Sequence, residues 1–109
     1  MNSKLVIAGM MLLVSALPLT AQEAKEIEIV HKDRAFAPNE ISVPANTAFT
    51  LRVKNSDGKS IEFESKAMKV EKVIAANSEA IIKVRPLKPG KYVFEDEFHE
   101  ATRGTVIAK

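Results

Sequence analysis

The segment PGKYVFEDEFH, residues 89–99, and the stretch GTVIA at 104–108 decide the fold of this chain. Pro-Gly at the start of the segment is a turn signal. After it, Tyr92 and Phe94 alternate with their neighbours, which is typical of one buried face of a β-strand. A short polar loop that carries His99 then leads to the closing apolar stretch. The pattern predicts two strands joined by a polar loop.

The residues before this segment repeat the same alternation in short runs between turn residues. Phe49, Leu51 and Val53 share one strand face, and NSDG at 55–58 is a turn signal. No run carries a helical period over eleven or more residues, although a single turn around 65–68 fits the sequence. We expect strands at 26–29, 40–43, 47–54, 61–64, 70–74, 78–84, around 92–94, and at 104–108. Seven or eight short strands with Gly, Pro and Asn turns predict an all-β sandwich with Greek-key links.

The first 21 residues have the order of a secretory signal peptide. Lys4 precedes an apolar run at 5–17, and small residues before Gln22 favour cleavage after Ala21. The run is shorter than the roughly 20 residues of a transmembrane helix, so an uncleaved anchor is the less favoured alternative. We expect export to the periplasm. One domain would remain at 22–109. The loss of Lys4 would change the net charge from +2 for the full chain to +1 for this domain.

The composition excludes several classes of function. The nearly balanced charge and the absence of a basic cluster argue against nucleic acid as a partner. Nothing in the chain matches a hydrolase triad, a phosphate loop or a dinucleotide fingerprint. The chain has no cysteine, so no disulfide supports this small domain and its stability must come from its core.

The strand–loop–strand segment resembles the ligand loop of cupredoxins, which reads Tyr-x-Phe-x-Cys-x-x-His with a methionine shortly after. Here Asp96 stands at the position of the cysteine and His99 at that of the histidine. The stretch FAPNEISVPANT at 36–47 is similar to the entry of cupredoxin-like domains. Asn46 replaces the usual glycine there, and asparagine tolerates left-handed backbone better than most residues.

Four further motifs resemble the EfeO-type cupredoxin-like proteins, small periplasmic proteins that are often encoded with ferrous-iron uptake permeases. These motifs are EFES at 62–65, EKVI at 71–74, PLKPG at 86–90 and EFHE at 97–100. The resemblance covers essentially the whole chain after the signal peptide. It implies a role in iron uptake together with a membrane iron permease or another periplasmic protein of such a system. Asp96 departs from it, because glycine is common at that position.

The side chains that could bind a metal ion limit which ions are possible. A blue-copper centre needs a thiolate, so the absence of cysteine excludes it. Imidazole and carboxylate donors remain near the loop, and they suit iron, manganese, copper(II) or zinc. We therefore expect an iron or copper ion as the cofactor. The predicted metal ligands are His99, Glu62, Glu64, Glu97 and Glu71.

These residues also have plainer interpretations. Glu62 and Glu64 flank the inward Phe63, so both point away from the core and could form an ordinary solvated strand face. His31 reads as a structural residue, and Met68 reads as core packing, since methionine fills apolar gaps readily.

The preferred interpretation is a metal-binding protein that supports iron uptake or Fe(II) oxidation with a membrane permease. Two alternatives stay open. One is a degenerate, metal-free cupredoxin whose acidic loop docks a partner protein. The other is a ferroxidase that turns over with oxygen or a copper cofactor. The fold alone does not decide among them.

Overall fold

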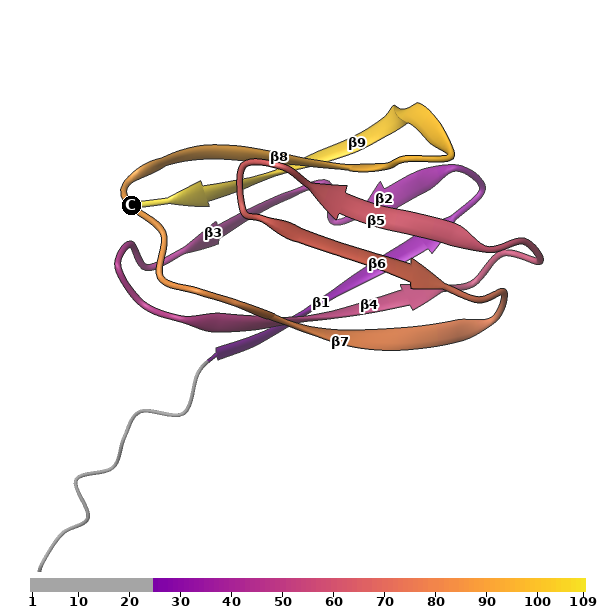
Figure 1. The fold of residues 1–109 in the computed structure, drawn as a ribbon, viewed down its shortest axis with the longest axis horizontal. Helices are drawn as coiled ribbons and strands as arrows, with labels where there is room; N and C mark the ends of the chain where they lie inside the picture. Colours follow the sequence, from indigo (N-terminus) through magenta and orange to yellow (C-terminus); the bar gives the residue numbers. More distant parts are fainter. Residues whose placement is uncertain (1–24) are drawn as a thin grey trace, which may run out of the picture.

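A computed structural model describes residues 25–109, which form a sandwich of two β-sheets (Figure 1). The predicted signal peptide at 1–21 lies outside the described residues. Across 25–109, no helix has the length and apolar character needed to cross a membrane. The strands are β1 (Lys25–Lys32), β2 (Ala35–Ala37), β3 (Glu40–Val43), β4 (Phe49–Asn55), β5 (Ile61–Ser65), β6 (Val70–Ile74), β7 (Ser78–Val84), β8 (Gly90–Asp96) and β9 (His99–Ala108).

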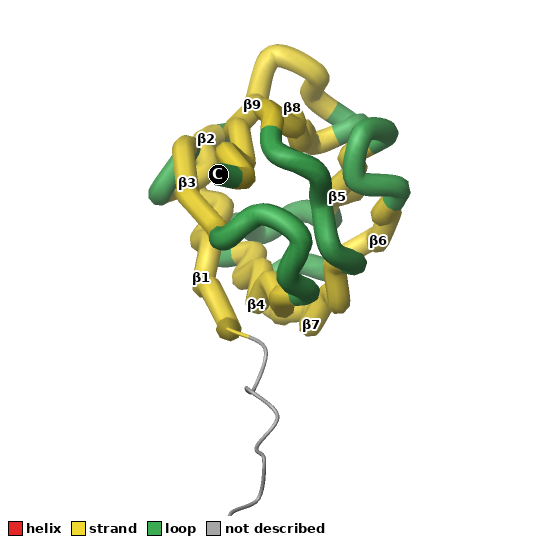
Figure 2. The backbone as a smooth tube through the Cα atoms, turned by 90° about the vertical axis from the view of Figure 1, so that its left-hand side faces the viewer, coloured by secondary structure: helices red, strands yellow, loops and turns green. Residues whose placement is uncertain are grey.

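The strands divide into two sheets that face each other around the core, as the end-on view of Figure 2 shows. One sheet has the order β2-β1-β4-β7 and the other has the order β3-β9-β8-β5-β6. The pairs β1–β4 and β3–β9 are parallel, and the other pairs are antiparallel. The predicted all-β sandwich is therefore confirmed.

The described residues contain nine strands where the sequence predicts seven or eight. The added strand is β2, whose three residues are too few to show an alternation of their own. β9 begins at His99, so the polar loop after β8 is shorter than expected. Asn46 has a φ of 58°, as its place in a turn predicted.

The core follows the alternation read from the sequence. Three phenylalanines from different strands meet within it: the rings of Phe63 and Phe94 stack with centroids 5.1 Å apart. The ring of Phe36 lies edge-on to both. Met68 is buried among the core residues, as predicted. This aromatic cluster reaches one end of the sandwich, where the ring of His31 lies edge-on to Phe36 at 5.1 Å.

Gly104 on β9 leaves the space that Phe94 occupies. A Cβ atom at this position would overlap the ring of Phe94 and lie 2.9 Å from the carbonyl oxygen of Asn39. The phenylalanine is fully buried, so its ring has little freedom to move away.

We expect Gly104→Ala to lower the free energy of unfolding by about 1–3 kcal/mol, because overpacking forces the ring and the backbone apart. Urea denaturation of the purified domain measures the effect. Gly58→Ala is the matched control, since a Cβ atom there meets nothing within 4 Å. Equal effects of the two substitutions would contradict the described packing of Phe94.

Candidate functional site

The turns β1–β2, β4–β5 and β8–β9 gather at one end of the sandwich, on the right in Figure 1. The buried side chain of Asn55 holds the β4–β5 turn. Its amide nitrogen donates to the carbonyl oxygens of Lys59, Ile74 and Ala75, at 2.8–3.1 Å. Its oxygen accepts from the backbone N–H of Asp57 at 3.1 Å. The turn is thereby fixed, and it presents the carboxylate of Asp57 to the β1–β2 turn.

Asp57 ties this end of the molecule together. Its carboxylate accepts from the backbone N–H groups of Asp33 at 2.9 Å and Arg34 at 3.5 Å. These two residues have φ values of 52° and 60°, which turn both N–H groups toward one acceptor. The hydrogen bonds, first that of Asp33, lower the pKa of Asp57 below its ordinary value, although burial opposes them. Asp57 Oδ2 also lies 3.1 Å from His31 Nδ1.

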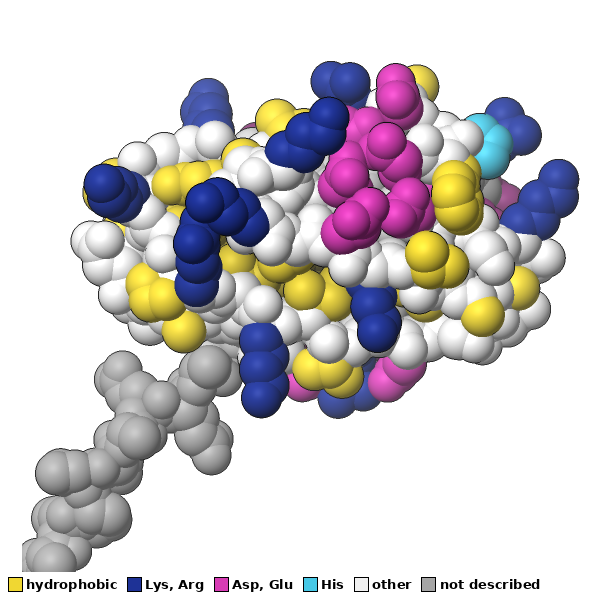
Figure 3. All heavy atoms as spheres, viewed as in Figure 1, with side chains coloured by type: hydrophobic (Ala, Val, Ile, Leu, Met, Phe, Trp, Pro, Cys, Tyr) yellow, Lys and Arg dark blue, Asp and Glu magenta, His cyan; other side chains and the backbone are white. Residues whose placement is uncertain are grey.

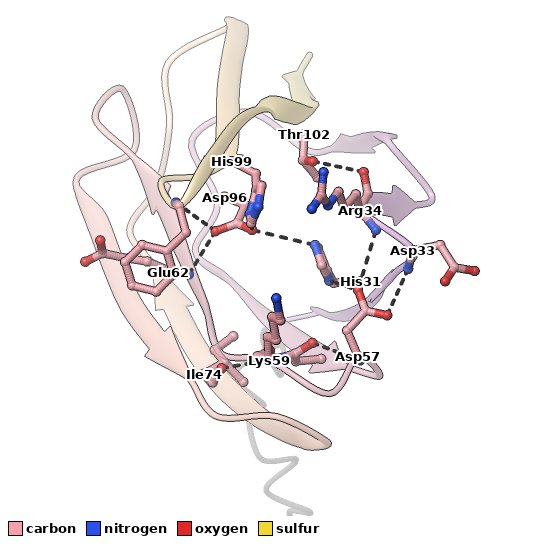
Figure 4. Close-up of polar contacts among 12 residues, drawn as sticks. His31, Asp33, Arg34, Asp57, Lys59, Glu62, Ile74, Asp96, His99 and Thr102 are labelled. Atoms are coloured by element: carbon pink, nitrogen blue, oxygen red, sulfur yellow. Dashed lines mark hydrogen bonds and ion pairs between the residues drawn. The ribbon is translucent and has the colours of Figure 1, made fainter.

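Asp96 lies at the centre of the same end, and its side chain is 1% exposed. Its Oδ1 accepts from the backbone N–H groups of Glu62 and Phe98, each at 3.0 Å. Its Oδ2 lies 3.7 Å from His31 Nε2 and 3.5 Å from His99 Nδ1. Figure 4 shows both imidazoles directed at this carboxylate from different strands. A buried carboxylate is stable only with such partners.

A pocket of about 390 Å³ opens beside these groups. The pocket is lined by both histidines and by Asp57 and Asp96. The side chains of Arg34 and Lys59 reach into it (Figure 4). His31 is buried, whereas 42% of the His99 side chain is exposed. We call this pocket the end pocket.

A second group of acids covers the outer surface of the sheet that contains β5, β6 and β8, where Figure 3 shows a block of acidic side chains. Glu64 lies opposite Glu71 on one neighbouring strand and opposite Glu95 on the other. Like charges in such cross-strand positions repel each other. We call this surface the acidic face; it consists of Glu62, Glu64, Glu71, Glu95, Glu97 and Glu100.

The proximity of these acids raises the pKa values of two of them, Glu64 and Glu62. A hydrogen bond with Glu97, partial burial and repulsion by Glu97 and Glu71 raise the pKa of Glu64 to about 7. A hydrogen bond with Glu71, with similar repulsion, raises the pKa of Glu62. Among the acids and histidines of residues 25–109, one set of three brings its ligand atoms within 4.8 Å of one another: Glu95, Glu97 and Glu100.

In the opposite sheet, the acids form ion pairs with basic side chains. Arg52 bridges Glu26 and Glu79 at 3.2 and 2.7 Å, and Lys54 pairs with Glu28 at 3.7 Å. No acid of the acidic face has an ion pair with a basic side chain in the described part of the chain. The glutamates of β1 and β7 are therefore paired with basic side chains, whereas those of the acidic face are not.

The structure brings together four of the five predicted ligands, Glu62, Glu64, Glu71 and Glu97, on the acidic face. It places the fifth, His99, at the end pocket beside Asp96.

Sequence reasoning did not identify Glu95 or Asp57. Glu95 could have been found from the alternation that turns Phe94 inward. Asp57 gave no signal, because its role depends on a turn from another strand.

Residues 5–108 match the family described as cupredoxin-like domain. An uncharacterized protein of Rickettsia prowazekii is 39% identical over 83 residues, which cover 75% of this chain and 66% of the relative.

Solved structures share the fold at low sequence identity. The metal-binding domain of the Streptococcus pneumoniae Cu(I)-exporting ATPase CopA, solved with Cu(I), has a TM-score of 0.73 at 13% identity, covering 83% of this chain and 91% of that one. Auracyanin A, a blue copper protein of Chloroflexus aurantiacus, has a TM-score of 0.67 at 15% identity, covering 80% of this chain and all of that one.

The raised pKa of Glu64 predicts a dependence of stability on pH. The folded state keeps this proton up to about pH 7, whereas the ordinary value is 4.5. The stabilisation from proton binding is therefore present below pH 4.5 and is lost as the pH rises through 7. We expect Glu64→Gln to stabilise the domain relative to wild type at pH 8 and to have little effect at pH 5.

Urea denaturation at the two pH values, with a chelator present, tests this expectation. Glu79→Gln is the control, because it removes a carboxylate that is paired with Arg52 and should give no gain at pH 8. The same effect of Glu64→Gln at both pH values would refute the shared proton.

Proposed function

Because this chain belongs to the cupredoxin-like domain family and has no cysteine for a blue-copper centre, we propose that it binds iron through the carboxylates of its acidic face. The observation that carries this proposal is the convergence of Glu95, Glu97 and Glu100, whose ligand atoms lie within 4.8 Å of one another, next to Glu64, which lies opposite Glu95. Two carboxylates held this close repel each other unless a cation lies between them. A proton fills that role below pH 7, and a metal ion can replace it.

The arrangement of the face suits a hard cation. Glu64 and Glu97 form one pair and Glu62 and Glu71 form another. Glu95 and Glu100 add oxygen atoms next to Glu97. Carboxylate oxygens stabilise Fe(III) over Fe(II), so iron held here becomes easier to oxidise. Binding would release the shared protons, which makes the affinity rise with pH through about 7.

The proposed biological role is to hold iron, or to assist the oxidation of Fe(II), for a membrane iron permease. The resemblance to EfeO-type proteins supports this role, together with a first segment that has the order of an export signal. Copper(II) would also bind in a test tube, because affinity rises along the first-row series toward copper. The ion that binds to the acidic face would then depend on which metal ions are available in the compartment.

Exposed apolar side chains beside the acidic face favour a second candidate function, the docking of a partner protein. Val73 lies opposite Glu62 in the sheet and is 55% exposed. Phe98 follows Glu97 in the chain and is 52% exposed. An acidic surface with exposed apolar side chains at its edge suits a partner surface that is basic and partly apolar, such as a loop of the permease that receives the metal.

We expect the domain to bind Fe(II) stoichiometrically in an anaerobic calorimetric titration at pH 7.5. Glu64→Gln combined with Glu97→Gln should weaken binding at least tenfold, because two charged ligands become neutral amides. The weakening should be smaller at pH 6, where wild type must first lose the proton held on Glu64.

Glu28→Gln is the matched control on the opposite sheet, where the side chain pairs with Lys54. It should bind iron as wild type does. Equal losses in the control and the double variant, or no binding by wild type, would overturn the acidic face as the iron site.

Export has its own test. We expect the full chain, produced in a Gram-negative host, to appear in the periplasmic fraction without its first 21 residues. The intact mass of the purified protein locates the cleavage after Ala21. Recovery of the uncleaved chain in the membrane fraction would instead support the anchor alternative.

A further inference from the structure

We propose that the end of the sandwich opposite the end pocket docks on an anionic membrane surface, by contact of its basic side chains with phospholipid headgroups. Three parts of the chain meet at this end, on the left in Figure 1: the β5–β6 turn, the connection from β7 to β8, and the last residue. We call this surface the basic end; it consists of Lys66, Lys69, Arg85, Lys88, Lys91 and Lys109. Docking there goes beyond iron binding and does not depend on it.

Backbone hydrogen bonds hold the parts of the basic end together. The N–H of Ala45 donates to the carbonyl oxygen of Lys109 at 3.3 Å, and the N–H of Asn46 donates to that of Leu87 at 2.7 Å. Ala67 and Leu87 line one hollow of about 370 Å³, which places the β5–β6 turn against the connection from β7 to β8. The basic side chains therefore project from a fixed scaffold.

The charge of the basic end is not balanced by acids. The segments 43–49, 65–70 and 85–92 contain no aspartate or glutamate. All six basic residues are exposed, and none of them forms an ion pair within residues 25–109. In Figure 3, dark blue side chains are spread over the left part of the molecule, and the block of acidic side chains lies nearer its centre. An anionic surface would attract the basic end and repel the acidic face, which fixes the orientation of approach.

The kind of side chain at the basic end favours lipid headgroups over a protein partner. Arg85 is its one arginine and the others are lysines, whose compact, hydrated charges suit a diffuse anionic layer better than paired recognition of single groups. Protein interfaces usually have apolar or aromatic anchors at their centre. The large apolar side chains that are exposed in the described residues, Val73, Ile81, Val93 and Phe98, do not belong to the turns that form this end. A layer of headgroups needs charge alone.

The start of β1 also places the basic end near a membrane during the predicted export. Lys25 pairs with Phe49 at the start of β4, at the same end of the sandwich (Figure 1). Residues 18–24 separate Lys25 from the apolar run at 5–17, and even fully extended they span at most about 30 Å. While that run occupies the bilayer, before cleavage or as an uncleaved anchor, the basic end lies close to the headgroups.

Docking by the basic end would stand the sandwich upright on the membrane. The strands run between the basic end and the end pocket, so the end pocket would point away from the bilayer (Figure 1). The acidic face, on the outer surface of β5, β6 and β8, would then face sideways, toward proteins embedded in the same membrane. Only this consequence rests on the proposed function of the acidic face.

The test is sedimentation of the domain at 22–109 with vesicles made of phosphatidylglycerol and phosphatidylcholine in equal parts. The first 21 residues are left out because their apolar run would bind lipid by itself. We expect binding at low salt and its loss at about 1 M salt, where charges are screened beyond about 3 Å. Lys66→Glu combined with Lys88→Glu should weaken binding at least tenfold, since each basic side chain near an anionic surface contributes about fivefold.

The fluorescence of Tyr92 reports which end of the molecule touches the vesicle. It is the one tyrosine of a chain without tryptophan, and its hydroxyl donates to the carbonyl oxygen of Lys88 at 2.6 Å. Acrylamide should quench this fluorescence less strongly when anionic vesicles are bound. Quenching that stays unchanged while the protein sediments with vesicles would contradict docking by the basic end.

Lys32→Glu combined with Lys59→Glu is the matched control, because it changes the net charge equally with two exposed residues at the opposite end. It should bind vesicles as wild type does. Equal losses in the two double variants would overturn the proposal, as would equal binding to vesicles of phosphatidylcholine alone or no binding by wild type at low salt. So would self-association without vesicles that the variant of Lys66 and Lys88 abolishes, since the partner would then be the acidic face of a second copy.

The iron titration keeps the two proposals apart. The double variant of Lys66 and Lys88 should bind iron as wild type does, whereas the double variant of Glu64 and Glu97 should lose iron binding and still bind anionic vesicles. A failure of iron binding therefore leaves the vesicle result unchanged, and a failure of vesicle binding leaves the iron result unchanged.

Discussion

The buried carboxylate of Asp96 is the interaction on which both surfaces of this protein depend. One oxygen receives the N–H groups of Glu62 and Phe98, and the other faces His31 and His99. The first oxygen fixes the end of β8 against β5 and thereby sets the position of the acidic face. The second oxygen forms the floor of the end pocket. A charge this deeply buried must be compensated, so the local backbone has to fold around it.

A carboxylate suits this place for a physical reason. In the cupredoxin loop that the sequence resembles, the position holds a thiolate that binds copper. A carboxylate has two oxygens, so it can accept backbone hydrogen bonds with one and keep the other free. The carboxylate itself therefore holds the loop to β5. Asp96 points inward in the same alternation as Tyr92 and Phe94, and the register irregularity between Glu95 and Asp96 interrupts the regular pairing of β8 with β9 there.

Much of the fold could be predicted from the sequence, because it rests on local alternation. Phe49, Leu51 and Val53 read as one buried face, and they form one. Part of the acidic face could also be predicted, because Glu62 and Glu64 must point outward when Phe63 points inward. The alternation could not give the spacing of these acids to Glu71 and Glu97, because that depends on how neighbouring strands pair.

The end pocket could not be predicted for a related reason. His31 read as structural, because nothing along the chain connects it with Asp57 or Asp96. Parallel pairing of β1 with β4 brings the end of β1 beside Asn55, and the turn after Asn55 then presents Asp57. Contacts of this kind depend on sheet topology, which periodicity does not contain.

The two outer surfaces of the sandwich differ in how the charges of their acids are balanced. Around Arg52, each acid has a basic partner, and the sheet gains a modest stabilisation from the network. Within residues 25–109, no acid of the acidic face forms such an ion pair, and the contact with Glu97 instead raises the pKa of Glu64 to about 7. A cross-strand pair of opposite charge reduces such repulsion, and Arg103 on β9 lies opposite Glu95 in this way. Glu64, in contrast, lies opposite a glutamate on each neighbouring strand, Glu71 on β6 and Glu95 on β8, and this arrangement is easiest to understand if the proposed cation binds there.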